Sequence, residues 1–152
     1  MEILTVHRFE QEKVWIGGKN AAGAELTPGK VVIWKATTTD ADQGVVVDLP
    51  VGDINATLGI AAKVAGVVDK TSSATGDLVR LQVFGPANVR ASASLNLNAL
   101  VVTATNNATN RGHVFEASTS TLTSPHYLGA VVGWTLENGP NATNSTVHLS
   151  LL

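Results

Sequence analysis

One strand pattern occurs twice in the sequence, and this repeat constrains the fold more than any other feature. In the first copy, Leu58 to Val83, a Leu-Gly step opens an apolar segment, a polar loop follows, and an alternating strand closes the pattern. The second copy, Leu128 to Leu152, has the same order of parts. Alternation of apolar and polar residues is typical of a half-buried β-strand. The expected correspondence pairs Val79, Leu81 and Val83 with Val147, Leu149 and Leu151.

The repeat extends upstream of both copies. Val31 to Ala36 precedes the first copy at a distance similar to that by which Leu100 to Ala104 precedes the second. The Ala-rich run Ile60 to Val68 has high helix propensity, but Gly66 within it would cost a helix about 1 kcal/mol. Its equivalent, Ala130 to Leu136, is rich in β-branched and aromatic residues, which favour strands. We therefore predict two degenerate copies of one β unit.

Length and turn residues indicate the domain organisation. A chain of 152 residues is expected to form one domain with its own core. Short apolar segments separated by Gly, Pro and Asn turns predict an all-β fold, either a small barrel or a sandwich. We expect a single β domain over residues 28–152, with repeat units at about 28–85 and 97–152. Residues 1–27 form either an N-terminal arm or the first strand of the barrel.

Composition excludes several classes of protein. The sequence has no cysteine, which excludes a disulfide scaffold, a Cys-ligated zinc site and thiol catalysis. Charged residues make up 14% of the chain, against roughly 25% in an average soluble domain. Two causes remain open. Other protein chains could cover much of the surface, because charged residues are depleted at interface cores, or the loops could simply be polar and uncharged.

Charge and hydropathy give no sign of nucleic acid or membrane as a partner. The net charge is −2, and the Lys and Arg residues are scattered along the chain, whereas nucleic-acid binding requires a basic patch. No apolar run approaches the roughly 20 residues that span a bilayer. The N-terminal segment is too charged for a signal peptide, so we expect synthesis in a cytoplasm.

A search for catalytic or metal-binding motifs finds no convincing candidate. His113 and Glu116 stand three residues apart, and with His126 they could ligate a metal. The first two lie on a predicted strand, however, where this spacing points side chains to opposite faces. Glu25 and Glu116 are carboxylates outside any recognisable glycosidase pair. We expect no catalytic residue, no metal and no cofactor, and hence a protein that is not an enzyme.

The tryptophans are the remaining candidates for a functional surface. Trp34 and Trp134 lie on apolar segments of the two copies, and we expect both in the core. Trp15 lies in a more polar region, next to a Gly-Gly step. It is either an anchor that binds another subunit or part of the first strand. The interface candidates, for a shell protein or a neighbouring subunit, are Phe9, Val14, Trp15 and Ile16.

The order of these segments resembles the head decoration (cement) proteins of tailed bacteriophages. In that family a turn delivers a strand, a Gly-hydrophobic-Ala strand follows, and a Gly-Asp strand closes the unit before a second, similar passage. The resemblance covers residues 28–152. One departure is Leu97 to Leu100, which replaces the family's usual Gly-Asp turn. The matching segments are Pro28 to Val32, Leu58 to Ala61, Gly76 to Gly85, Gly112 to Ala117 and Leu128 to Val132.

The resemblance implies a β barrel or sandwich of β-tulip or SH3-like barrel type and a structural role without catalysis. It implies a virion protein on the outer capsid surface, where the major capsid protein and other copies of this chain, as a homotrimer, would be the partners. Two alternatives stay open. One is another virion module, from a tail or a fibre. The other is a carbohydrate-binding β module that uses Trp15 or Tyr127 as a stacking platform.

Overall fold

The computed structural model of the chain describes residues 12–35, 45–50, 63–103, 108–117, 131–139 and 144–151. The described residues form nine strands and one 3-10 turn, η2 (Ala108–Asn110), and no α-helix, which confirms the all-β prediction. The strands of the first half are β1 (Val14–Asn20), β2 (Val31–Trp34), β3 (Val46–Asp48), β4 (Val64–Val68) and the long β5 (Leu78–Arg90). The others are β6 (Leu100–Thr103), β7 (Val114–Glu116), β8 (Val131–Thr135) and β9 (Asn144–Ser150).

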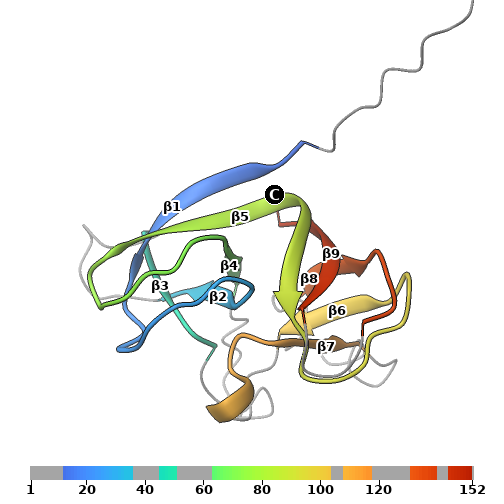
Figure 1. The fold of residues 1–152 in the computed structure, drawn as a ribbon. Helices are drawn as coiled ribbons and strands as arrows, with labels where there is room; N and C mark the ends of the chain where they lie inside the picture. Colours follow the sequence, from blue (N-terminus) through green and yellow to red (C-terminus); the bar gives the residue numbers. More distant parts are fainter. Residues whose placement is uncertain are drawn as a thin grey trace, which may run out of the picture.

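The strands form two lobes that share β5. Their order is β1-β3-β2-β4-β5-β9-β8-β6-β7, and β1 also pairs with β5, so the first five strands close into a barrel. β5 runs across this first lobe and then turns down into the second, which holds β6 to β9 (Figure 1). The turn occurs at Gly85, whose φ of 85° favours glycine. A Cβ at Gly85 would also overlap the main-chain oxygen of Glu12.

The pairing order confirms two copies of one β unit. The sequence of neighbours β3-β2-β4-β5 in the first lobe is repeated as β7-β6-β8-β9 in the second. The β2–β4 and β6–β8 pairs are both antiparallel, and each has a bulge directly after the residue that faces a glycine. These facing pairs are Val32 with Gly66 and Val101 with Gly133. A shared bulge is a strong sign of common geometry, because bulges fix the local bend and twist of a sheet.

The register of the closing strands differs from the prediction by two residues. Val67 pairs with Gln82, and its equivalent Trp134 pairs with His148. Leu81 therefore corresponds to Val147, whereas the sequence alignment had matched it to Leu149. The predicted Leu-Gly steps that open each copy lie outside the described residues.

β1 also belongs to the repeat. It pairs antiparallel with the first half of β5, as the second half of β5 pairs with β9. After β1, Ala21 N donates to Val47 O at 2.8 Å, and after β5, Ser92 N donates to Val114 O at 2.8 Å. Residues 14–20 are thus the first strand of the barrel, and the described part of residues 1–27 is built into the first lobe.

The turn before β6 has the same geometry as the equivalent turn before β2. Asn98 has a φ of 61°, and its equivalent Gly29 has a φ of 84°. Asn98 N donates to Thr135 O at 3.1 Å, as Gly29 N donates to Val68 O at 2.9 Å. Asn tolerates the left-handed region better than other non-Gly residues. Asn98 therefore replaces glycine without changing the path of the chain.

Each lobe has its own apolar core. The first core contains Leu26, Val32, Val47, Ala65, Val68, Val79 and Leu81. The second contains Ala87, Val89, Ala91, Leu95, Val101, Val114, Val132, Val147 and Leu149, together with Val31 and Val67 from the first lobe. The two cores use equivalent positions, such as Leu26 and Leu95. The insertion of Val31 and Val67 fixes the lobes to each other, and Val31 N adds a 2.7 Å hydrogen bond to Gly112 O.

Candidate interaction surfaces

A cross-strand row of four side chains lies on the outer face of the first barrel. Val31 pairs with Val67, Val67 with Gln82, and Gln82 with Trp15. Directly opposite residues share one face of a sheet. The second lobe buries the β2 and β4 end of this first-lobe row, so Val31 and Val67 are almost fully buried. Trp15, at the other end, is 43% exposed.

The second lobe has the equivalent row. Leu100 pairs with Trp134, Trp134 with His148, and His148 with Pro86. In this second-lobe row Trp134 is 47% exposed, whereas Leu100, His148 and Pro86 are partly buried. The two rows thus occupy equivalent positions, and their burial differs.

The exposed end of the first-lobe row forms a polar-rimmed apolar patch. The guanidinium of Arg80 lies 5.7 Å from the centroid of the Trp15 ring. Arg80 Nε also donates to Asp69 Oδ2 at 2.6 Å, which holds the guanidinium in place. Leu78, on the same strand, is 84% exposed. These residues border an open groove of about 800 Å³, lined by Trp15, Gly17, Lys70, Thr71, Asp77 and Leu78, among others.

The predicted interface candidates occupy different environments. Trp15 points outward, whereas Ile16 is partly buried and packs against the first core. Val14 is half-buried and pairs with Phe84 where β5 approaches its bend. Phe9 lies outside the described residues. Of the three described candidates, Trp15 has the large exposed side chain that an interface anchor requires.

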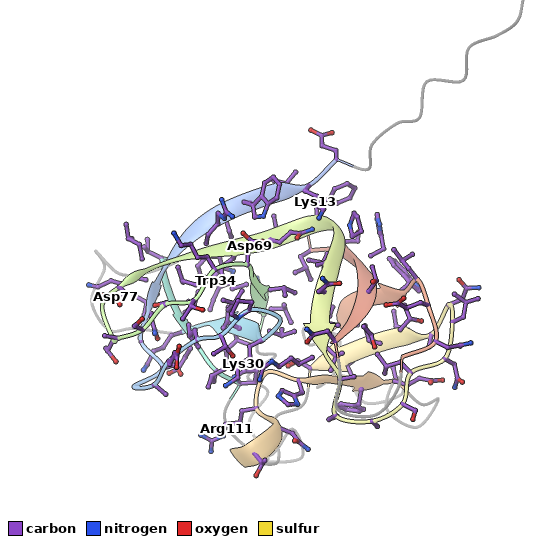
Figure 2. All side chains as sticks on the ribbon, in the orientation of Figure 1. Lys13, Lys30, Trp34, Asp69, Asp77 and Arg111 are labelled. Carbon is purple, nitrogen blue, oxygen red and sulfur yellow. The ribbon has the colours of Figure 1, made fainter. Side chains whose placement is uncertain are left out.

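The two tryptophans that we expected in the core also differ. Trp34 is partly buried and packs against the first core, within the first lobe in Figure 2. Trp134 is exposed, so its assignment to the core was wrong. The two residues are not equivalent in the repeat, because Trp134 corresponds to Val67 and not to Trp34. Tyr127 lies outside the described residues.

Of the polar residues considered for metal binding, Glu116 supports a loop through its carboxylate. Glu116 Oε2 accepts hydrogen bonds from Asn96 Nδ2 at 2.8 Å and from Asn96 N at 3.3 Å. His113 lies at the seam between the lobes, where burial and the charges of Arg90 and Lys30 lower its pKa. His126 lies outside the described residues, which contain no group of three potential metal ligands. Within this part of the chain no helix is long and apolar enough to cross a membrane.

Charged residues are distributed unevenly between the two halves of the chain. Of the ten Lys and Arg and twelve Asp and Glu residues, only Arg111, Glu116 and Glu137 follow residue 90. The low overall charge was predicted to matter, whereas this asymmetry, which can be counted directly along the chain, was not predicted. The equivalent residues show its effect on the surface, since Asp69 and Arg80 of the first lobe correspond to Leu136 and Thr146 of the second.

Comparison with known proteins gives a structural likeness. No family model and no curated protein matches the sequence. Among solved structures, the chain is similar to the N base of the head fiber protein gp8.5 of bacteriophage phi29. The TM-score is 0.57 and the sequence identity 11%, over 92% of this chain and 96% of that chain. The likeness shows that the two chains share an all-β fold over nearly their whole length.

Proposed function

We propose that this protein is a structural component of a tailed-phage virion, carried on the outside of the head as a decoration (cement) protein. The single observation that supports this most is the whole-length similarity to the N base of a phage head fiber. The similarity spans both lobes, because it covers 92% of the chain. The order of sequence segments resembles phage decoration proteins independently of that comparison.

The chemistry of the described surface supports a binding role without catalysis. The carboxylate of Glu116 holds a loop, and Glu137 Oε1 accepts a 2.7 Å hydrogen bond from Thr146 N. Large apolar side chains are exposed around Trp15 and Trp134. A cement protein stabilises a particle by mass action, because it binds the assembled shell and not its separate subunits. Such a role requires contact surface rather than an active site.

The base of a head fibre is the second candidate, and the identity of the structural neighbour favours it. The two roles differ in stoichiometry. Decoration that covers a symmetric shell requires about one copy per shell subunit, whereas fibres require far fewer. The copy number in purified particles, quantified against the major capsid protein, separates them. Absence from particles would overturn both and would direct attention to glycan binding at Trp15.

We propose that the first-lobe patch around Trp15 and Leu78 contacts the major capsid protein. Both side chains are exposed on one lobe and border the same groove. Exposed aromatic residues in such settings often dominate interface energies. Trp15→Ala is expected to weaken binding to empty shells at least about tenfold. Lys35→Gln, on the same lobe but outside the groove, is the matched control, and equal loss in both variants would contradict the assignment.

Residues before β1 can be tested separately. β1 begins at Val14 and pairs with β5 along its length, so removal of residues 1–11 leaves the barrel strands complete. If Phe9 contributes to shell binding, this truncation should weaken binding while thermal unfolding stays unchanged. Unchanged shell binding would remove Phe9 from the interface.

A further inference from the structure

Basic residues from three separate segments meet at the seam between the two lobes. Ala91 and Val114 form a parallel bridge. This register sets Arg90, at the end of β5, beside His113, which directly precedes β7. Residues that lie directly opposite on neighbouring strands share one face of a sheet. The effect of Arg90 on the pKa of His113 agrees with this placement.

Lys30 reaches the same place from the first lobe. The residues on both sides of it form hydrogen bonds across the seam. Gly29 O accepts from Arg90 N at 2.9 Å, and Val31 N donates to Gly112 O at 2.7 Å. A Cβ at Gly112 would lie 3.4 Å from Lys30 Cβ. These contacts fix the backbone of Lys30 between the other two segments.

Arg111 adds a third positive charge beside them. It directly follows η2, and Figure 2 shows Lys30 and Arg111 on the side of the molecule where η2 lies. Arg111 Nε and His113 Nδ1 are buried and have no hydrogen-bond partner among the described residues. Buried polar atoms without a partner are uncommon in folded proteins, so these two nitrogens indicate a place for an acceptor. We call Lys30, Arg90, Arg111 and His113 the seam cluster.

No described carboxylate balances the seam cluster. Elsewhere in the first lobe Arg80 pairs with Asp69. Within the part of the chain that the structure describes, no ion pair joins Lys30, Arg90 or Arg111 to an acidic residue. The side chains of the cluster are half-buried, where charges are screened less than in open solvent. The seam is thus locally positive, although the whole chain has a net charge of −2.

We infer that the seam cluster binds an oxyanion, a sulfate, phosphate or carboxylate group, between Lys30, Arg90 and His113. A bound anion relieves the repulsion among like charges that the fold has brought together. Arginine and lysine donate charge-assisted hydrogen bonds to the oxygens of such groups. Two sources can supply this chemistry, a free anion or the acidic side chains of a partner protein, and two probes separate them.

His113 makes this site sensitive to pH. Burial, Arg90 and Lys30 lower the pKa of His113, whereas a bound anion raises it because it favours the protonated ring. By linkage, protonation of His113 strengthens anion binding by the same factor. Binding should therefore be at least about threefold tighter at pH 5 than at pH 7.5.

The test is a titration of the full chain with sodium sulfate at constant ionic strength, followed by nuclear magnetic resonance. Sulfate keeps its double charge over this pH range. It should shift the imidazole resonances of His113 saturably. Lys30→Gln and Arg90→Gln should each weaken binding at least about fivefold. His113→Asn, followed through backbone amide resonances, should retain binding by the cations and lose its pH dependence.

Tetraglutamate, titrated in the same way, identifies the source of the oxyanion. Tighter binding of the peptide than of sulfate indicates an acidic segment of a partner protein, and binding of sulfate alone indicates a free anion. Lys70→Gln is the matched control, because it removes the same charge from an exposed site on the first lobe. It should leave both affinities unchanged.

Two results would overturn the inference. One is the failure of both probes to move the His113 resonances. The other is an equal loss of affinity in Lys70→Gln and Lys30→Gln, because binding would then follow the net charge and not the seam cluster. Far-ultraviolet circular dichroism establishes that each variant is folded. No virion is required, so the result is independent of the proposed function.

Discussion

The two lobes share one β unit, but their surfaces have diverged in opposite directions. The first carries ion pairs, such as Lys35 with Asp48 at 2.9 Å, and one end of its cross-strand row is buried by the second lobe. The second has few charges, and Trp134 in its row is exposed. Most core positions are apolar in both copies because packing constrains them directly, but the second lobe has the buried polar residues Thr135 and Ser145 where the first has Val68 and Val79. Outer positions depend on what covers them, so they can diverge between the two lobes more freely than core positions.

The largest expected difference between the lobes lies at their equivalent bulge glycines. A Cβ at Gly133 would overlap the main-chain oxygen of His148, whereas a Cβ at Gly66 would lie 2.9 Å from Leu81 Cβ. Gly133→Ala should therefore lower the free energy of unfolding by about 3–5 kcal/mol, and Gly66→Ala by about 1–3 kcal/mol. Urea unfolding curves measure both.

Gly17→Ala is the control for this pair. Gly17 lies on β1, and a Cβ there would meet nothing within 4 Å. Its free energy of unfolding should stay within about 0.5 kcal/mol of the wild type. A smaller effect at Gly133 than at Gly66 would mean that the second sheet is looser than its geometry indicates.

The equivalent turn residues provide a smaller test of the same comparison. Gly29→Ala should cost about 1–2 kcal/mol, because the left-handed φ is unfavourable for alanine and the added Cβ would lie 3.3 Å from Arg90 Cγ. Asn98→Gly should change the free energy of unfolding by less than about 0.5 kcal/mol, because both residues accept this backbone conformation. A large loss from Asn98→Gly would show that the Asn98 side chain, and not only its backbone, supports the turn.

The sequence predicted the all-β fold and the repeat, and the error in register has a simple cause. Side chains in a strand alternate with a period of two, so an alignment shifted by two residues preserves every inward position. Leu81 therefore matched Leu149 as well as Val147. The true register follows from the pairing of the closing strands with β4 and β8, which hydrophobicity alone does not show.

The surface was harder to predict than the core. The apolar segment around Trp134 correctly indicated a strand, but alternation specifies a face and not what covers that face. The repeat of β1 by the second half of β5 was missed because the equivalent residues Trp15 and Pro86, and Gly17 and Asn88, differ in type. The packing of Arg80 on Trp15 joins two strands that lie far apart in sequence. Such contacts depend on tertiary structure, which spacing along the chain does not encode.

The seam between the lobes should make stability depend on pH. Burial, then Arg90 and Lys30, lower the pKa of His113 below its ordinary value of 6.5. At a pH between the lowered pKa of folded His113 and its ordinary pKa of 6.5, the unfolded state binds more protons than the folded state. The free energy of unfolding should therefore fall as pH drops below 6.5. His113→Asn should remove this part of the dependence, as measured by urea midpoints between pH 7.5 and pH 5.

The matched variant is Arg90→Gln, which removes one charge that faces His113 and should reduce the slope without abolishing it. The first lobe has Val46, which does not titrate, at the position equivalent to His113. The pH dependence expected from His113 therefore has no counterpart at the equivalent position of the first lobe. A His113 pKa at or above 6.5 in the folded protein, from nuclear magnetic resonance, would contradict the prediction.

The smallest expected effect concerns the charged surface of the first lobe. Arg80→Gln removes the contact with Trp15 and the ion pair with Asp69. The side chain of Arg80 is 60% exposed, and that of Asp69 is 28% exposed. Solvent screens such exposed interactions, so the free energy of unfolding should fall by less than about 1 kcal/mol. Added salt should narrow the gap between variant and wild type, because it screens the ion pair of the wild type.

Thr146→Val, at the equivalent position of the second lobe, provides the comparison for Arg80→Gln. Thr146 has no ion pair to lose, so the difference from wild type should not depend on salt. If salt changed the stability of both variants equally, the electrostatic effect of the first-lobe charges would not come from their individual ion pairs. The salt dependence of stability would then reflect the net charge of the whole molecule and not a difference between the surfaces of the two lobes.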